Sequence, residues 1–469
     1  MTANPSSPDH FRVISPVDGS VLFEQAYQDS AALSAVLDAS RQAQRAWRAT
    51  PLAQRIALVQ AAMQWLQDHG AQVAESVTRQ MGRPISQSPG ELRGMKERAD
   101  HMCAIAPQAL ADLVPAPKAG FNRFLRREPV GTVLVLAPWN YPLLTAVNSI
   151  VPALVAGNCV ILKHSAQTPQ IADFFARAFQ AAGLPAGVFQ AIYARHEDTL
   201  ALVAAPQVDF VAFTGSVAAG RSVQRALGDR FIHAGLELGG KDPAYVRADA
   251  DVAFAVENLV DGSFFNSGQS CCGIERIYVH RSLYARFVDD FVALTRQYRL
   301  GDPLQADTNL GPMVRADAAA FVRAQIAEAV GQGARALIDP SAFAASREGT
   351  AYLAPQVLVD VDHRMRVMTE ETFGPVVGIM AVDDDDEALR LMNDSPYGLT
   401  ASLWTRDLER ATALGDQIET GTVFMNRCDY LDPALAWTGV KDTGRGISLS
   451  ELGFAQLTRI KSFHLRHPA

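Results

Sequence analysis

The sequence predicts an α/β protein built from two doubly wound parallel sheets. From residue 130 onward, short β-prone segments alternate with helical segments, which is the pattern of parallel βαβ units. The first β-prone segment, 130–136, is almost continuously apolar, as expected for a strand that is buried on both faces. The chain has 469 residues, more than one ordinary core can serve, so two or three domains are expected.

The elements of the first α/β region follow from these patterns. Upstream of it, the segments 31–47 and 51–69 space their apolar residues by three and four, which predicts two amphipathic helices. The strands of the region are predicted at 130–136, 159–162, 188–192 and 209–213, with helices at 143–156 and 169–182. Ligands of such sheets bind at the carboxyl ends of the strands, which directs attention to the residues just after 136, 162 and 213.

A second α/β region begins near residue 240. Its strands are predicted at 274–280, 376–382, 400–404 and 422–426, and its helices at 283–298, 315–332 and 384–393. The acidic run 383–386 suits the first turn of the last helix, where negative charge is favourable, better than it suits a metal site. The alternating tail 456–465 predicts a late strand that pairs with another subunit.

Composition and charge argue against several classes of protein. A net charge of −8 does not suit a protein that holds nucleic acid phosphates. The five cysteines contain no C-x-x-C pair, so neither a disulfide framework nor a thiolate metal site is indicated. The first residues lack the pattern of a signal peptide, and no apolar run reaches the roughly 18–20 residues that span a bilayer. We therefore expect a cytoplasmic protein without a metal, a nucleic acid partner or a membrane partner.

Two polar side chains follow strands of the first region. Asn140 lies between prolines after the strand 130–136, where its side-chain N–H can stabilise an oxyanion or its side chain can cap the next helix. Lys163 follows the strand 159–162, where it can reach a phosphate or a ribose, or remain a surface lysine at a strand end.

A glycine-containing loop and a carboxylate come next. The glycines after strand 209–213 let the backbone approach a ligand at a helix N-terminus. The loop 215–222 almost matches a triphosphate-binding loop, but Arg221 replaces the required lysine, so a dinucleotide pyrophosphate is the better ligand. Glu237 is flanked by leucines, which can raise its pKa to that of a general base; a local salt bridge is the alternative.

Cys271 and Cys272 are adjacent in the chain and follow a bend at Gly268. Neighbouring side chains point in different directions, so one pocket rarely uses both. A cysteine at such a bend, close to backbone N–H groups, can serve as a nucleophile, whereas buried packing is the usual role of a cysteine.

Taken in order, these motifs resemble the aldehyde dehydrogenase superfamily over nearly the whole chain. The matching segments are Pro138-Trp-Asn-Tyr-Pro142, Phe213-Thr-Gly-Ser216, Leu236-Glu-Leu-Gly-Gly240, Phe265-Asn-Ser-Gly-Gln-Ser-Cys271, Glu371-Thr-Phe-Gly-Pro375 and Asn393-Asp-Ser-Pro-Tyr-Gly-Leu399. The resemblance implies two doubly wound Rossmann-like domains, one for the cofactor and one catalytic, plus a small β oligomerisation element. The implied boundaries are 1–116 and 130–238 for the cofactor domain, 239–440 for the catalytic domain, and a hairpin at 117–129 with 441–469 for the oligomerisation element of a homodimer or homotetramer.

The resemblance also implies a reaction on a small-molecule aldehyde. Cys271 adds to the carbonyl carbon, and the oxyanion is held by Asn140 and the backbone N–H of Cys271. Oxidation by NAD or NADP then gives a thioester, which water activated by Glu237 hydrolyses to the acid. Cys272 is expected to point into packing. The residues implied to bind the cofactor are Trp139, Lys163, Gly215, Ser216, Leu238, Glu371 and Phe373.

The chain departs from the family pattern in ways that bear on specificity. Ala166 stands where NAD-preferring members carry a glutamate that binds the adenosine 2′-hydroxyl, so NADP is expected to be tolerated, with His164 close to it. The segment 436–441 also differs from the family's usual Pro-Phe-Gly-Gly region near the substrate entrance. A largely apolar substrate entrance is expected, which predicts medium aliphatic or aromatic aldehydes. The residues expected to form it are Trp139, Tyr141, Phe264, Phe265, Tyr430, Leu431 and Trp437.

Three other functions compete with this interpretation. The CoA-acylating branch of the same superfamily resolves the thioester with a thiol, but it usually lacks a glutamate at the position of Glu237. A triphosphate-binding module would use the loop 215–222, which Arg221 disfavours. A catalytically silent scaffold would not need the complete set of Asn140, Glu237 and Cys271.

Overall fold

The first sheet of the computed structural model, which describes residues 10–468, has six strands in the order β18-β8-β7-β4-β5-β6. Five strands run parallel: β4 (Thr132–Ala137), β5 (Cys159–His164), β6 (Phe189–Ile192), β7 (Phe210–Thr214) and β8 (His233–Glu237). The short β18 (Gly444–Arg445) closes the β8 edge in the antiparallel direction. The carboxyl ends of the parallel strands therefore lie at one edge of the sheet, as a doubly wound fold requires.

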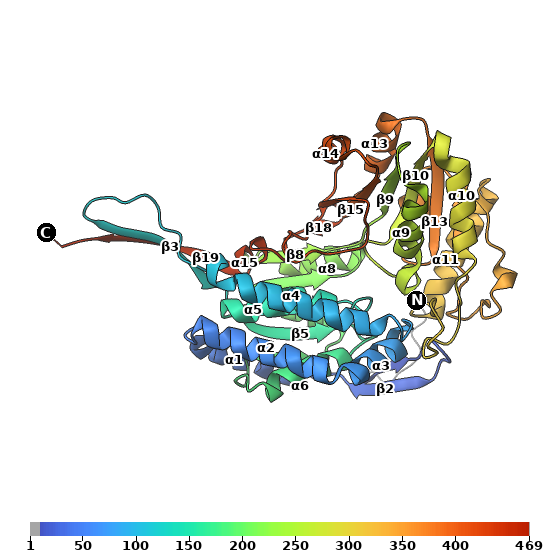
Figure 1. Cartoon of the computed structure of the whole chain (residues 1–469). Helices are drawn as coiled ribbons and strands as arrows, with labels where there is room; N and C mark the ends of the chain where they lie inside the picture. Colours follow the sequence, from blue (N-terminus) through green and yellow to red (C-terminus); the bar gives the residue numbers. More distant parts are fainter. Residues whose placement is uncertain (1–9, 469) are drawn as a thin grey trace.

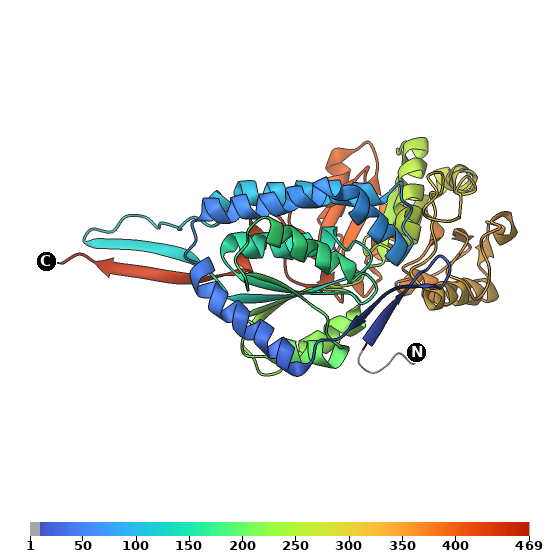
Figure 2. The same cartoon turned by 90° about the horizontal axis from the view of Figure 1, so that it is seen from below.

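Helices cover both faces of this sheet (Figures 1 and 2). The core on one face joins the sheet to α2 (Leu52–Asp68), α4 (Ser88–Ala109), α5 (Leu144–Ala156) and α6 (Gln170–Ala181), and α3 (Gly70–Met81) extends it. The core on the other face joins it to α1 (Ser30–Trp47), α7 (His196–Ala204) and α8 (Val217–Leu227).

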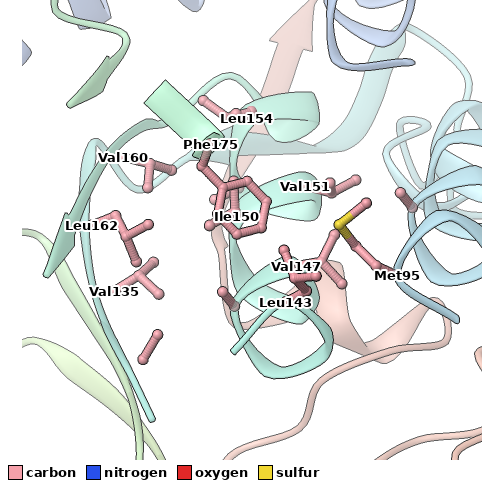
Figure 3. Packing of buried hydrophobic residues seen from close by; sticks show 14 of the residues in the cluster. Met95, Val135, Leu143, Val147, Ile150, Val151, Leu154, Val160, Leu162 and Phe175 are labelled. Carbon is pink, nitrogen blue, oxygen red and sulfur yellow. The ribbon is translucent and has the colours of Figure 1, made fainter. Parts of the chain in front are cut away.

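Helix α5 is enclosed on two sides, which explains why almost all of its residues are apolar. Val135 of β4 and Val160 of β5 lie on its sheet side, and Met95 of α4 lies on the opposite side (Figure 3). Burying one such side chain stabilises a fold by roughly 1.5–3 kcal/mol. The helix ends at Gly157, whose φ of 96° is a left-handed conformation that glycine adopts without steric cost. This packing fixes the loop between β4 and α5, which carries Asn140.

The second sheet has seven strands in the order β11-β12-β13-β10-β9-β15-β16. Its parallel strands are β9 (Asp242–Val246), β10 (Ile274–His280), β12 (Gln356–Val359), β13 (Val376–Val382), β15 (Thr400–Trp404) and β16 (Thr422–Met425), and the short β11 (Arg335–Ala336) is antiparallel. Helices α9 (Val252–Phe264) and α10 (Arg281–Thr295) pack on one face. Helices α11 (Ala316–Gly331), α13 (Asp385–Asn393) and α14 (Leu408–Gly415) pack on the other.

A two-stranded antiparallel ribbon projects from the body of the molecule (Figure 1). It pairs β3 (Phe121–Pro129) with β19 (Thr458–Arg466) along their whole lengths. A smaller hairpin of β1 (His10–Ile14) and β2 (Val21–Ala26) lies near the other end of the chain.

The predicted fold class is confirmed, and one local prediction is wrong. In the segment 117–129, expected to be a hairpin, an antiparallel bridge between Lys118 and Phe121 turns the chain at 119–120, and β3 then also pairs with the tail. Strand β5 was expected to end at 162, but it continues to His164, so Lys163 lies within the strand. The predicted late strand at 456–465 is β19. Within residues 10–468, no helix is both long and apolar enough to cross a membrane, and no cluster of acidic, histidine or cysteine side chains could hold a metal ion.

Candidate active site

Cys271 follows a tight left-handed bend at the end of α9. Asn266, Ser267 and Gly268 have φ values of 53°, 57° and 68°. Such conformations persist only where the surroundings hold them, and they concentrate at functional sites. A Cβ on Gly268 would lie 2.3 Å from the carbonyl oxygen of Gly374, so only glycine fits there. After the bend, Cys271 remains partly exposed whereas Cys272 is buried.

Two cavities meet at Cys271. The larger cavity, of about 440 Å³, lies against α4 and the first turn of α5. The smaller cavity, of about 260 Å³, lies between the β4–α5 loop and the start of α8. Thr214, Glu237, Leu238 and Cys271 line both cavities. A thiol at this place is accessible to a different ligand from each side.

Glu237 lies at the carboxyl end of β8, with its side chain at the same junction. Its Oε2 atom accepts a hydrogen bond of 3.1 Å from the hydroxyl of Thr214. Burial raises the pKa of Glu237, while the hydrogen bond from Thr214 and the charge of Arg98 oppose that shift. No basic side chain within residues 10–468 forms an ion pair with Glu237, so the salt-bridge alternative is wrong. A carboxylate held in this way suits general base catalysis.

Asn140 is buried in the loop between β4 and α5. Its side-chain amide donates to the carbonyl oxygen of Gln269 at 3.3 Å, beside Cys271. The helix-capping alternative is wrong because α5 begins at Leu144 and takes no side-chain cap from Asn140. Glu91 fills that role: its Oε1 accepts from the backbone N–H groups of Leu143 at 2.7 Å and Leu144 at 3.1 Å.

A buried ion pair holds the Asn140 loop in place. Arg83 pairs with Glu91, donates to the backbone carbonyl oxygen of Asn140, and donates to Asn266 Oδ1 at 3.0 Å. Its guanidinium also lies 4.5 Å from the ring centroid of Tyr141. Arg83 thus ties the oxyanion loop to the bend that presents Cys271. Sequence reasoning missed Arg83 and Glu91, because neither stands in a recognised motif.

Cys272 makes a contact that sequence reasoning also missed. It packs in the hydrophobic core, as expected, but its Sγ also donates to Asp429 Oδ1 at 2.9 Å and it lines the larger cavity. A hydrogen bond with Cys271 and burial raise the pKa of Cys272 well above its ordinary value, so this sulfur stays a thiol. Burial also raises the pKa of Asp429, to about 6.

The smaller cavity gathers most of the residues expected to bind a cofactor. It is lined by Trp139, Gly215, Ser216, Leu238, Glu371 and Phe373, together with Asn140, Glu237 and Cys271. Lys163 is partly buried on β5 and does not line this cavity.

The chemistry of these groups fits a dinucleotide. Ser216 caps α8 by accepting from the N–H of Ala219 at 3.3 Å, so the helix start presents N–H groups that attract phosphate. Glu371 is partly buried, and its carboxyl oxygens can accept from ribose hydroxyls; Oε1 already accepts from the N–H of Gly240 at 3.0 Å. Burial raises the pKa of Glu371 to about 8.

Two expectations about individual residues are corrected, and His164 has hydrogen-bond partners that the sequence does not reveal. His164 is buried, with Nε2 3.0 Å from the Pro142 carbonyl oxygen and Nδ1 3.1 Å from the Thr168 hydroxyl, so both ring nitrogens have partners within the protein. Burial lowers the pKa of His164 to about 4. Phe264 is fully buried in the core of the second sheet and lines neither cavity. Trp139 lines the smaller cavity only.

The architecture is that of an NAD(P)-dependent oxidoreductase. A doubly wound sheet lies beside a second α/β unit, and the Cys271 thiol lies where the two cavities meet. A model of the aldehyde dehydrogenase family matches residues 3–463, so the chain belongs to this family. The prediction of an NAD(P)-dependent aldehyde dehydrogenase is therefore confirmed.

Several relatives share most of the chain. The succinate-semialdehyde dehydrogenase [NADP(+)] of Deinococcus radiodurans is 32% identical, over 98% of this chain and 95% of that protein. The 3,6-anhydro-alpha-L-galactose dehydrogenase of Streptomyces coelicolor is 33% identical, over 98% of this chain and 94% of that protein. The structure of a succinic semialdehyde dehydrogenase from Streptococcus pyogenes with NADP+ superposes with a TM-score of 0.93 at 27% identity, covering 97% of this chain and 100% of that one.

Proposed function

We propose that this aldehyde dehydrogenase oxidises medium-sized aliphatic or aromatic aldehydes to carboxylic acids, with Cys271 as the nucleophile, Glu237 as the general base and Asn140 as an oxyanion donor. The observation that carries the proposal is that Cys271 and Glu237 lie together at the junction of the two cavities. Positioning of this kind supplies much of the barrier reduction in enzymes.

The chemistry of each residue follows from its surroundings. The Cys271 sulfur adds to the carbonyl carbon of an aldehyde in the larger cavity, and N–H groups of Asn140 and of the Cys271 backbone hold the oxyanion. When bound, NAD(P)+ supplies the acceptor for the electron pair removed in oxidation. Glu237 takes a proton from the water that attacks the resulting thioester, and Thr214 fixes the orientation of that carboxylate.

The smaller cavity supports the assignment of the cofactor residues. Gly215 and Ser216 bind the pyrophosphate at the start of α8, and Glu371 binds the nicotinamide ribose. The remaining assignments are Lys163 for the adenosine ribose, the Leu238 backbone for the nicotinamide amide, and Trp139 and Phe373 for packing. The edge contact of the Trp139 and Phe373 rings, with centroids 5.5 Å apart, supports a wall built by both.

The domain division and assembly form part of the same proposal. The cofactor domain comprises 1–116 and 130–238, the catalytic domain 239–440, and the oligomerisation element 117–129 with 441–469, in a homodimer or homotetramer. The projecting ribbon supports this assembly, because Ile460 and Leu465 of β19 are exposed on it. Residues 444–445 of the last segment also join the six-stranded sheet, which anchors the ribbon to the cofactor domain.

The lining of the larger cavity supports the proposed substrates. Five of the expected entrance residues line it: Tyr141, Phe265, Tyr430, Leu431 and Trp437. The printed names of relatives include succinate-semialdehyde, anhydrogalactose and indole-3-acetaldehyde dehydrogenases. Since family members differ this widely, the side chains of this cavity decide which aldehyde the chain accepts.

A panel of aldehydes of graded length and charge, assayed with both cofactors, tests the proposed function. We expect the absorbance of reduced nicotinamide to rise with either cofactor, because Ala166 places no carboxylate against a 2′-phosphate. Activity without added CoA would exclude the acylating alternative. A kcat/KM with NADP+ more than about a thousandfold below that with NAD+, roughly 4 kcal/mol, would contradict the cofactor prediction. Ala166→Glu is the matched control and should selectively lower activity with NADP+.

The raised pKa of Glu237 predicts a pH dependence. Only the ionised carboxylate accepts a proton, so kcat should fall as the pH drops through this raised pKa. The same shift affects stability: a carboxyl group with a raised folded-state pKa stabilises the fold below its ordinary pKa, and this contribution is lost as the pH rises through the folded pKa. A kcat profile that stays flat across the neutral and acidic range would contradict the assignment of Glu237 as the base.

A further inference from the structure

Arg98 of α4 is a buried cation in the larger cavity without an anionic partner. Only 8% of the residue is exposed, and it lines the cavity. Its Nη1 donates to two neutral acceptors of α5, the Leu144 carbonyl oxygen at 3.0 Å and Asn148 Oδ1 at 3.3 Å. No carboxylate in the described range 10–468 forms an ion pair with it. A buried charge without a counter-charge is unfavourable, which marks the place where an anion binds best.

The other donors of Arg98 open on the cavity. Nε and Nη2 have no hydrogen-bond acceptor among the residues that the structure describes. Neither of these two nitrogen atoms is completely enclosed by protein. Arg83 lines the same cavity, but its guanidinium is already engaged in an ion pair with Glu91 and in hydrogen bonds to Asn140 and Asn266. Of these two arginines, only Arg98 has donors left for a ligand.

The carboxylates around the cavity are already engaged. Glu91 is paired with Arg83, Asp429 accepts from Ser270 and Cys272, and the exposed Glu97 accepts from the hydroxyl of Tyr430. Glu237 is held by Thr214 and does the base chemistry. None of these groups neutralises Arg98 by direct contact, so the cation is available to a group on the substrate.

The face of α4 leaves room for such a group. Gly94 and Gly90 line the cavity one and two turns before Arg98, and neither contributes a side chain. A guanidinium with two free N–H directions matches a carboxylate in bidentate geometry.

We propose that Arg98 is a specificity-determining residue that binds a carboxylate carried by the aldehyde substrate. The chemical class is an aldehyde whose chain bears an acidic group remote from the carbonyl. This inference rests on the proposed function and narrows its substrate class from medium-sized aliphatic or aromatic aldehydes to those that carry a carboxylate.

The test compares a short unbranched aldehyde bearing a terminal carboxylate with its neutral methyl amide. The wild-type protein should oxidise the carboxylated compound with at least about tenfold higher kcat/KM, the size of one hydrogen bond to a charged group. Arg98→Met should lower kcat/KM for that compound by about 10- to 100-fold, mainly through KM, and change the neutral compound by less than about threefold. Arg98→Lys, which keeps the charge without the planar fork, should retain part of the preference and serves if Arg98→Met fails to fold. Lys96→Met is the matched control, since Lys96 lies on the same helix, pairs with Asp100 and does not line the cavity, and it should leave the ratio unchanged.

Three outcomes would overturn the inference. The wild-type protein could oxidise both compounds equally well. Arg98→Met could lower both activities equally and shift the pH profile of kcat, which would assign Arg98 to the electrostatics of Cys271 and Glu237 instead. Arg93→Met, at an exposed arginine that lines the same cavity, could change the ratio as much as Arg98→Met does, which would assign the carboxylate to Arg93. If the wild-type protein oxidises no aldehyde of the panel, the proposed function itself is wrong.

Discussion

Replacing Cys271 by alanine is expected to abolish aldehyde oxidation, whereas Cys272→Ala should retain most of it. Cys271 is partly exposed where the two cavities meet, and it provides the covalent step. Cys272 is buried as a thiol that donates to Asp429. We expect steady-state turnover of Cys271→Ala at saturating NAD(P)+ to fall by at least about a thousandfold. Thermal melting of both variants serves as the folding control.

The adjacent position makes this comparison informative. In Cys272→Ala, Asp429 keeps its hydrogen bond of 3.1 Å from the Ser270 hydroxyl, so the cavity wall retains one polar contact. If Cys272→Ala lost activity while Cys271→Ala kept most of it, the nucleophile would be Cys272 and not Cys271.

Replacing Glu237 by glutamine is expected to stall the reaction after the covalent step. Glutamine keeps the shape of the side chain and can still contact Thr214, but it cannot accept a proton from water. Steady-state turnover should fall by about 10²- to 10⁴-fold, the usual contribution of a general base. Mass spectrometry should then find an acyl group on Cys271, and added hydroxylamine should release it.

A different result would reassign the carboxylate. If Glu237→Gln accumulates no adduct and hydroxylamine restores nothing, Glu237 acts before the thioester forms, on the Cys271 thiol. Thr214→Val provides a graded comparison, because it removes the hydrogen bond to Glu237 but leaves the carboxylate in place.

The strands that could be predicted are those whose own residues favour a strand without a contribution from distant segments. The strands at 274–280, 376–382 and 400–404 were predicted to the residue, because each is a short segment in which β-branched or aromatic residues recur. Strand β9 was not predicted, since it begins Asp242-Pro243. Its Asp242 is satisfied by Thr400 of β15, whose N–H and hydroxyl both donate to it. That pairing joins positions 158 apart in sequence, which no local pattern reveals.

The site residues divide in the same way. Asn140, Glu237 and Cys271 stand in recognisable motifs, so their positions were anticipated. Arg83 and Arg98 look like ordinary polar residues of a helical region, because their partners come from distant segments; Arg83 and Asn266 are 183 positions apart. The partners of His164 were not anticipated, because the sequence gives no sign that both of its nitrogens form hydrogen bonds inside the protein.

Because the two cavities meet only at the junction around the Cys271 sulfur, substitutions that change the aldehyde cavity can be separated from substitutions that change the cofactor cavity. Thr214, Glu237, Leu238 and Cys271 belong to both walls, and every other lining residue of the larger cavity belongs to that side alone. Substitutions along the α4 wall, apart from Glu91, which holds the Asn140 loop through Arg83, can therefore change which aldehyde enters without altering the cofactor cavity. In this architecture, the substrate can change through substitutions in one cavity, whereas the four residues shared by both cavities have to be retained.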